Sequence, residues 1–265
     1  MANGRFERFS FSRASLAQGE DAKPLYDAFM QDVEQNYGNN SNLRAISYDE
    51  ETTELVGSNI FVVSRLSENL KSSNLRTAIP SDDRYGDIFR LIKGKFYVDL
   101  NAAILRTAGD SYKPNDKIAK DLAEKIEEKE RKLKLPVMVV SPVVRYLPED
   151  KNYALTFSLS EDSLIIQDER LDGKKYLYMK FNEVDDLGLP IFDKEGTRTW
   201  HAREDGLSRL IFYGDSGLNS NNELLAISYD NGRVVLVRGE ATQNLNKEQI
   251  EKSYTMEDII KALMI

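Results

Sequence analysis

The sequence predicts an α+β protein built mainly from antiparallel strands, arranged as an OB-like barrel or sandwich with two or three peripheral helices. Two turn signals favour this architecture, because Lys93-Gly94 and Asn231-Gly232 each separate two runs of strand-like residues. Glycine supplies the positive φ that a two-residue hairpin turn requires. The order of the elements shows no alternation of strands and helices that would indicate a parallel sheet.

Residues 1–42 are expected to form an N-terminal arm and a helix packed on the core. The arm carries three phenylalanines spaced by Arg and Ser, which indicates a tail or an edge strand. The segment DAKPLYDAFMQDVEQNYG (21–38) has Pro24 near its first turn, an apolar stripe and Gly38 as a stop signal. These features predict a packing helix.

Residues 43–241 are predicted to form a β-rich, nucleic-acid-binding core with a helical insertion at about 115–135. The insertion has a narrow apolar stripe among charges in i,i+4 arrangement. The pentapeptide AISYD occurs at 45–49 and at 226–230, which either an internal duplication or convergence on a good hairpin pattern explains. The predicted strands are LRAISYD, TTELV and NIFVVSRL within 43–66, the hairpin at 88–100, VMVVSPVVRYL, YALTFSL, SLIIQDE and KKYLYMKF within 137–182, LSRLIFYG at 207–214, and ELLAISYD and RVVLV on either side of Asn231-Gly232.

The hairpin across Lys93-Gly94 is predicted to turn its cations and its tyrosine to one side. Strand side chains alternate, so pairing Ile92 with Lys95 gives a core face of Phe89, Leu91, Phe96, Val98 and Leu100. The opposite face then carries Arg90, Lys95 and Tyr97 together with Ile88, Ile92 and Asp99. A cation that follows phosphates beside a ring that stacks on bases is typical of single-strand binding. An ordinary solvated sheet face is the alternative.

The run KKYLYMKF (174–181) repeats this pattern, because apolar residues alternate in it with lysines and tyrosines. The segment TRTWHAR (197–203) adds two arginines around a tryptophan. The candidate DNA-binding residues are therefore Arg84, Tyr85, Arg90, Lys93, Lys95, Tyr97, Lys174, Tyr176, Tyr178, Lys180, Arg198 and Trp200.

Charge is distributed unevenly along the chain. The net charge is −8, yet the windows 5–13, 84–97 and 170–181 carry +2, +3 and +3 and are rich in Phe or Tyr. A basic, ring-bearing surface on an acidic body suits a protein that coats nucleic acid without adhering to every polyanion. The absence of cysteine excludes disulfides and thiolate chemistry.

The sequence offers little catalytic chemistry. His201 is the single histidine, no serine lies in a nucleophile-elbow pattern, and the glycine-rich phosphate motifs are missing. We therefore expect no enzyme, no cofactor and no bound metal. The alternative is a magnesium-dependent nuclease, for which acidic pairs such as Asp82-Asp83, Glu149-Asp150 and Asp185-Asp186 would supply ligands.

Residues 242–265 are expected to form an acidic, then apolar C-terminal tail. The chain has no apolar leader and no run long enough to span a bilayer, so we expect a cytoplasmic protein with no membrane partner. A last short helix docked on the domain remains the alternative to a protruding tail. The candidate partner-binding residues of the tail are Ile259, Ile260, Lys261, Leu263, Met264 and Ile265.

The basic, tyrosine-bearing runs at 88–97 and 174–181, the acidic balance and the ending EDIIKALMI together resemble the single-stranded DNA-binding proteins of Enquatrovirus-like podophages, the coliphage N-four type. The resemblance covers length and plan across the chain. It implies an OB-type barrel that coats DNA in the host cytoplasm during replication and recombination, and a tail that contacts replication or transcription proteins. The ending departs from the usual bacterial tail, which finishes in Pro-Phe. A protein-interaction subunit of a phage transcription or virion assembly is the rival function.

Overall fold

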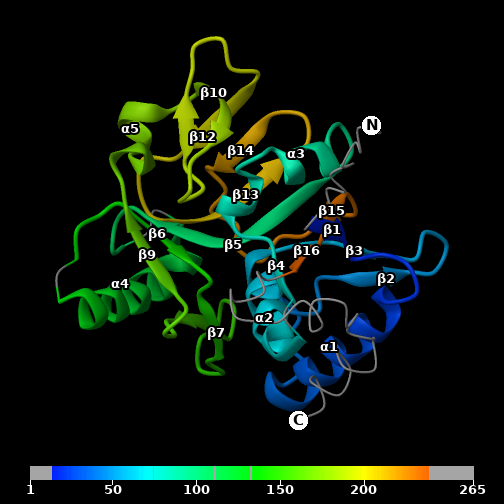
Figure 1. Cartoon of the computed structure of the whole chain (residues 1–265). Coiled ribbons are helices and arrows are strands. Elements are labelled where there is room, and N and C mark those ends of the chain that lie inside the picture. The colour runs from blue at the N-terminus through cyan, green and yellow to red at the C-terminus, as the bar shows by residue number, and fades with distance from the viewer. Residues whose placement is uncertain (1–13, 74, 110–111, 132, 239–265) are drawn as a thin grey trace, which may run out of the picture.

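The computed structural model describes residues 14–73, 75–109, 112–131 and 133–238, and it confirms a mainly antiparallel α+β protein (Figure 1). The strands form an eleven-stranded, a three-stranded and a two-stranded sheet, and the large sheet is not closed into a barrel. Its main path runs in the order β11-β10-β12-β14-β13-β5-β15-β3-β2, and β6 pairs with β5 and β9 beside that path. Two neighbouring pairs, β12 with β14 and β5 with β15, are parallel.

The elements have the following bounds. The large sheet contains β2 (Ser47–Asp49), β3 (Glu54–Val56), β5 (Tyr97–Leu105), β6 (Val137–Val140), β9 (Leu164–Gln167), β10 (Met179–Val184), β11 (Pro190–Phe192), β12 (Arg198–Ala202), β13 (Leu207–Tyr213), β14 (Gly217–Ser220) and β15 (Gly232–Arg233). The smaller sheets contain β1 (Ala14–Leu16), β16 (Val235–Arg238) and β4 (Leu75–Thr77), and β7 (Val143–Tyr146) with β8 (Leu155–Ser158). The helices are α1 (Ala22–Asn36), α2 (Ile60–Leu70), α3 (Asp87–Ile92), α4 (Asp116–Glu130) and α5 (Gly173–Tyr176), with short 3-10 turns η1 (Lys71–Ser73), η2 (Pro80–Asp83), η3 (Lys113–Asn115) and η4 (Glu169–Leu171).

Strand β5 lies at the centre of the molecule, and every one of its residues is buried. Its alternating side chains divide between two hydrophobic cores. Leu105 belongs to the core formed with α1, α2 and α4. Ile104 belongs to the second core, which contains Trp200 of β12 and Phe212 of β13. A strand buried on both faces explains why the polar-out pattern predicted for 95–100 does not hold.

Several predicted elements are confirmed. The apolar stripes of 21–38 and 115–135 form α1 and α4, whose inner faces contribute Phe29 and Leu122 to the first core. The predicted turn near Glu50 joins β2 and β3 as an antiparallel pair. The strand runs between 137 and 167 form β6, β7, β8 and β9.

The predicted strand NIFVVSRL is wrong, because residues 60–70 form helix α2. Asn59 caps this helix with its side-chain oxygen, which accepts a hydrogen bond of 2.9 Å from the amide of Val62. The helix is buried on most sides, so its apolar residues form a continuous run without helical periodicity. A short continuous apolar run cannot be assigned to helix or strand by its pattern alone.

The hairpin predicted across Lys93-Gly94 is also wrong. Residues 87–92 form helix α3, in which Ile88 and Ile92, one turn apart, are fully buried. Gly94 does have a positive φ of 70°, but its turn joins a helix to a strand. The carboxylate of Asp83 accepts the amide of Phe89 at 2.8 Å and so fixes the start of α3 from outside the helix. The predicted alternation of 88–92 therefore does not exist.

Two further strand predictions need correction. In 174–181, Lys174 and Lys175 belong to α5 and Lys180 belongs to β10, and Leu177 and Met179, expected inside, are 38% exposed. Residues 223–230 hold no strand, so Asn231-Gly232 does not close a hairpin. Gly232–Arg233 instead pairs with β5 and β3.

The expected arm at 1–13 and the expected tail at 242–265 lie outside the described residues. Residues Ala14–Leu16, which follow the expected arm, form β1, an edge strand of the three-stranded sheet. No helix in the described ranges has the length and apolar character needed to cross a bilayer.

Candidate nucleic-acid interface

One row of residues crosses five neighbouring strands of the large sheet in register. Lys180 of β10 pairs with Thr199 of β12, Thr199 with Gly217 of β14, Gly217 with Tyr213 of β13, and Tyr213 with Tyr97 of β5. Residues paired across strands point to the same side of a sheet. The ammonium group of Lys180 confirms this by donating a hydrogen bond of 2.8 Å to the hydroxyl of Thr199. A cation and aromatic rings therefore share one side of this sheet.

A second row, displaced by two residues along the strands, adds the rings of Tyr178 and His201. His201 follows Thr199 on the same side of β12, and Tyr178 packs against it edge to face with ring centroids 5.4 Å apart. The ring of Tyr178 is 61% exposed. Tyr178 has a positive φ of 61°, and its amide bonds to the carbonyl of Trp200 at 2.9 Å. The backbone therefore holds an exposed ring at the start of β10.

The reverse side of the same strands is core. Met179, Trp200, Leu218, Phe212 and Val98 are the corresponding register partners, and all but Met179 are fully buried. The side that carries Lys180 is uncovered over β10, β12 and the end of β13, since Lys180 is exposed and Thr199, His201 and Tyr213 are half-buried, whereas Ile211 and Asp99 farther along it are buried. We call the surface formed by Tyr178, Lys180, Thr199, His201 and Tyr213 the open sheet face.

The electrostatics of the open sheet face favour an anion. Within the described residues Lys180 has no carboxylate at ion-pair distance. Burial, and then the charge of Lys180, lower the pKa of His201, so this ring is neutral at pH 7. Lys93 and Lys95 are exposed and lie on either side of Gly94. The amide of Gly94 donates to the carbonyl of Gly214, which follows Tyr213 in the chain. Further cations thus flank the aromatic end of the row.

Aromatic contacts continue beyond Tyr213. The ring of Tyr97 lies 5.8 Å from that of Tyr213 and 6.2 Å from that of Tyr229. Burial raises the pKa of Tyr97 to about 12, and its hydroxyl donates to the carbonyl of Ser58 and accepts the amide of Tyr229. Tyr97 is therefore a buried support, whereas Tyr229 is 52% exposed.

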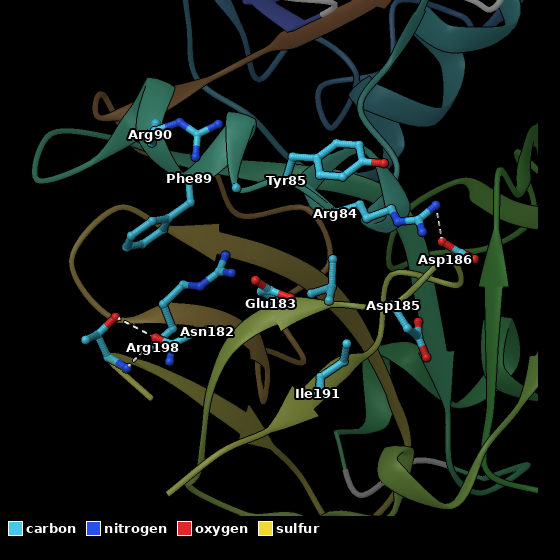
Figure 2. A pocket seen from close by; sticks show the side chains of 13 residues that line it. Arg84, Tyr85, Phe89, Arg90, Asn182, Glu183, Asp185, Asp186, Ile191 and Arg198 are labelled. Carbon is cyan, nitrogen blue, oxygen red and sulfur yellow. Dashed lines mark hydrogen bonds and ion pairs between the residues drawn. The ribbon is translucent and has the colours of Figure 1, made fainter. Parts of the chain in front are cut away.

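Some of the other predicted residues line a separate groove of about 650 Å³ between α3 and β10 (Figure 2). Arg84, Tyr85 and Arg90 line it, and Tyr85 is 71% exposed. Arg84 is ion-paired with Asp186, and Arg90 is ion-paired with Asp87. The carboxylates of Glu183, Asp185 and Asp186 also line the groove. Because these three carboxylates would repel phosphates, this groove suits a polyanion less well than the open sheet face.

Four predicted site residues need correction or relocation. Trp200, Arg198 and Tyr97 are 0%, 3% and 1% exposed, so the outward orientation expected of them is wrong. The guanidinium of Arg198 is ion-paired with buried Asp83 and lies over the rings of Phe89 and Phe181. The ring of Tyr176 stacks on Phe192 with centroids 5.3 Å apart, away from the open sheet face. Lys93, Lys95 and Lys174 are exposed as expected.

Sequence reasoning missed His201, Tyr213 and Tyr229 as surface rings. The alternation of buried Arg198, Trp200 and Ala202 along β12 was a signal for His201, since it leaves His201 and Thr199 on the opposite side. No local signal marks Tyr213, because its strand is buried over the rest of its length. Only the pairing of β13 with β14 and β5 shows where its ring lies.

Within the described ranges, no three Asp, Glu or His side chains come together as a group that could hold a metal ion. No protein-family model, no curated protein and no solved structure matches the chain.

Proposed function

We propose that the protein binds unpaired nucleic acid, single-stranded DNA in the first place, on the open sheet face. The observation that supports this most is the registered row in which Lys180, with no carboxylate at ion-pair distance among the described residues, and half-buried Tyr213 lie on the uncovered part of one side of the sheet. A lysine follows the phosphates while rings stack on bases of any sequence. Sheet surfaces that carry exposed rings bind single strands in this way.

Gly217 lies between Thr199 and Tyr213 in the row. Its φ of 111° favours glycine, and a Cβ atom there would lie 2.9 Å from the backbone of Thr199. Only glycine therefore allows β14 to lie this close to β12 at the middle of the row.

The resemblance to phage single-stranded DNA-binding proteins extends the proposal to a cellular role. In that role the protein coats DNA during replication and recombination in the host cytoplasm. Residues 242–265, with the apolar group Ile259 to Ile265, then contact replication or transcription proteins.

A protein-interaction subunit is the second candidate, because large apolar side chains are exposed on the β10–β11 hairpin and just before it. Leu177, Met179, Leu187 and Ile191 are 38%, 38%, 46% and 49% exposed. Clusters of this kind commonly mark protein contacts. Salt dependence separates the two functions, since phosphate binding weakens steeply as salt rises, with a slope near −0.7 per phosphate on single strands.

The test compares two matched double variants in a titration of fluorescein-labelled dT20 followed by anisotropy. Tyr178→Ala with Lys180→Ala removes a ring and a cation from the open sheet face. We expect the affinity to fall at least about tenfold, because one stacked ring contributes about 1–3 kcal/mol. The salt slope should also become shallower, since one phosphate contact is lost.

Tyr85→Ala with Arg84→Ala is the control, because it removes an equally exposed ring and cation from the α3–β10 groove. Its affinity should stay within about twofold of the unaltered protein. If this control loses binding while the first variant keeps it, the strand lies in the groove and the open sheet face is not the site. If neither unaltered protein nor variants bind dT20 at low salt, the proposed function is wrong.

The affinity for dT20 is expected to rise as the pH falls into the range in which His201 takes up its proton. His201 has a lowered pKa in the free protein, so the bare surface takes up its proton only in acid. Phosphates beside the ring favour the imidazolium, and binding therefore takes up a proton in that range. His201→Gln should remove the rise and leave affinity at pH 8 unchanged.

Because the pKa of His201 is lower in the folded protein than in the unfolded chain, His201 also lowers folding stability as the pH falls below about 6.5. Melting curves at each pH are therefore needed as a control. A rise that persists in His201→Gln would assign the effect to another group.

A further inference from the structure

A second, smaller pocket of about 230 Å³ lies between helix α2, strand β4 and the β6–β7 turn. Its lining combines polar side chains of α2 and β5 with the apolar groups of Leu75 and Val143. From this geometry we propose that the pocket binds a guanine base, with the phosphate of the same nucleotide at its mouth. This site is separate from the open sheet face, and it does not depend on the proposed function.

The floor of the pocket is formed where β5 is interrupted by a bulge. The register of β5 against β13 shifts between Leu100 and Ala103, which leaves Asn101 out of the ladder. Its amide instead donates to the carbonyl of Ala78 at 2.8 Å, and its carbonyl accepts the amide of Ser141 at 2.8 Å. Bulges redirect side chains and are frequent beside functional sites. Here the bulge turns a buried carboxamide toward the pocket.

Hydroxyl groups orient that carboxamide. Ser64 is fully buried and donates to Oδ1 of Asn101 at 2.8 Å, while Nδ2 lies 3.5 Å from the hydroxyl of Ser141. Because Oδ1 is occupied, the amide nitrogen is the group left for a ligand. Ser141 itself has a φ of 54°, an unfavourable conformation for a residue with a side chain. Strain of this kind gathers at ligand sites.

Glu68 supplies a carboxylate that its own neighbours do not fully engage. Arg65 binds Asp32 through two guanidinium nitrogens at 2.7 and 2.5 Å. Within the described residues the only hydrogen bond to the Glu68 carboxylate comes from the remaining nitrogen of Arg65 at 3.3 Å. The side chain of Glu68 is 15% exposed, and burial raises its pKa. Two carboxylates thus share one guanidinium, and Glu68 is the one with a free acceptor.

The mouth of the pocket carries two cations. Lys71 is ion-paired with Asp162 at 2.9 Å, but these side chains are 52% and 72% exposed, so the pair is weak. Arg76 lines both this pocket and the adjoining groove beside β16, and two of its guanidinium nitrogens bind the carboxylate of Asp82, so Lys71 is the cation that a phosphate can engage. A phosphate at the mouth would replace the weak pair of Lys71 and leave the base inside.

Guanine matches this arrangement better than the other bases. Its N1–H and 2-amino group are adjacent donors that a carboxylate such as Glu68 accepts, whereas adenine presents an acceptor at N1. Its O6 and N7 are acceptors, to which the amide nitrogen of Asn101 can donate, while Lys71 stays with the phosphate. The volume is below the range of about 300–1,000 Å³ usual for drug-sized ligands, which suits one base.

The test is calorimetric titration of the full chain with GMP, AMP and IMP, which lacks the 2-amino group. We expect GMP to bind about tenfold more tightly than AMP, with IMP between them. Glu68→Gln keeps an oxygen for Arg65 and should remove the preference for GMP while leaving the melting temperature and dT20 binding unchanged. Glu127→Gln, which changes an exposed glutamate of α4 far from the pocket lining, is the matched control and should behave like the unaltered protein.

A second arm identifies the source of the base. A dT20 strand with one central guanine, compared with dT20 alone, shows whether the pocket takes a base from a bound strand or only a free nucleotide, and either result supports the guanine site. Equal affinity for GMP and AMP, no binding of GMP, or a preference that survives Glu68→Gln overturns it. Failure of dT20 to bind would leave the GMP result intact and contradict only the proposed function.

Discussion

Replacing Asp99 by alanine is expected to destabilise the protein by about 3–5 kcal/mol, because it leaves a guanidinium charge without compensation in the centre of the fold. Asp99 and Arg209 have side chains that are 0% exposed. One nitrogen of Arg209 contacts both carboxylate oxygens at 3.1 and 3.2 Å and the carbonyl of Ile227 at 2.8 Å. Burial raises the pKa of Asp99, and the charge of Arg209 opposes that effect.

The double variant Asp99→Leu with Arg209→Met should recover most of this loss, since removing both charges also removes their desolvation cost. Two nitrogens of Arg209 have no hydrogen-bond partner among the described residues, which adds to the cost of the native pair. Urea unfolding of Asp99→Leu, of Arg209→Met and of the double variant measures the coupling energy between the two side chains. Asp87→Ala, which breaks the exposed pair with Arg90, is the control and should cost no more than about 1 kcal/mol. A double variant no more stable than Asp99→Ala would show that the pair itself stabilises the fold.

Trp200→Ala is expected to cost about 3–5 kcal/mol, because it leaves a large cavity in the second core. The indole is fully buried, and its nitrogen donates to the carbonyl of Arg170 at 3.1 Å. His201→Ala, at the next position of the same strand, should cost far less because its side chain lies on the open sheet face. Thermal and urea unfolding measure both changes.

A conservative variant at the same position tests which face of the sheet binds the strand. Trp200→Phe should keep its affinity for dT20, since the side chain at this position lies on the reverse of the binding surface. A stable Trp200→Phe protein that fails to bind would place the indole in the interface after all.

The elements predicted correctly are those whose pattern is set by local contacts. Helices α1 and α4 lie on the surface with one apolar stripe each, so their periodicity is visible in the sequence. The strands β6 and β9 are continuous apolar runs bounded by turn residues. In these segments local propensity and tertiary environment agree.

Other elements depend on residues that are distant in the chain. The pentapeptide AISYD contributes to strand β2 at 47–49, yet its second copy at 226–230 forms no strand. The first copy pairs with β3, whereas in the second the amide of Tyr229 bonds to the hydroxyl of Tyr97. Identical sequence thus adopts two conformations, because the available partners differ.

The kinds of residue in the candidate site were predicted better than their positions in the fold. Tyr178 and Lys180 are exposed and lie close together, as expected of cations and rings that bind a strand. Their partners His201 and Tyr213 come from β12 and β13, which are joined through the parallel pairing of β12 with β14. A sequence read as consecutive hairpins contains no such pairing, so it cannot bring these side chains together.

The three-stranded sheet also has a consequence for the way the chain is made. Its middle strand, β16, pairs Val237 with Ala14 of β1 on one side and with Arg76 of β4 on the other. Until residues 235–238 have left the ribosome, β1 and β4 have no strand between them and their edges stay open. Contacts between residues so distant in sequence form slowly, and unpaired strand edges favour aggregation. Translation speed and chaperone supply should therefore affect the yield of folded protein more than its final stability does.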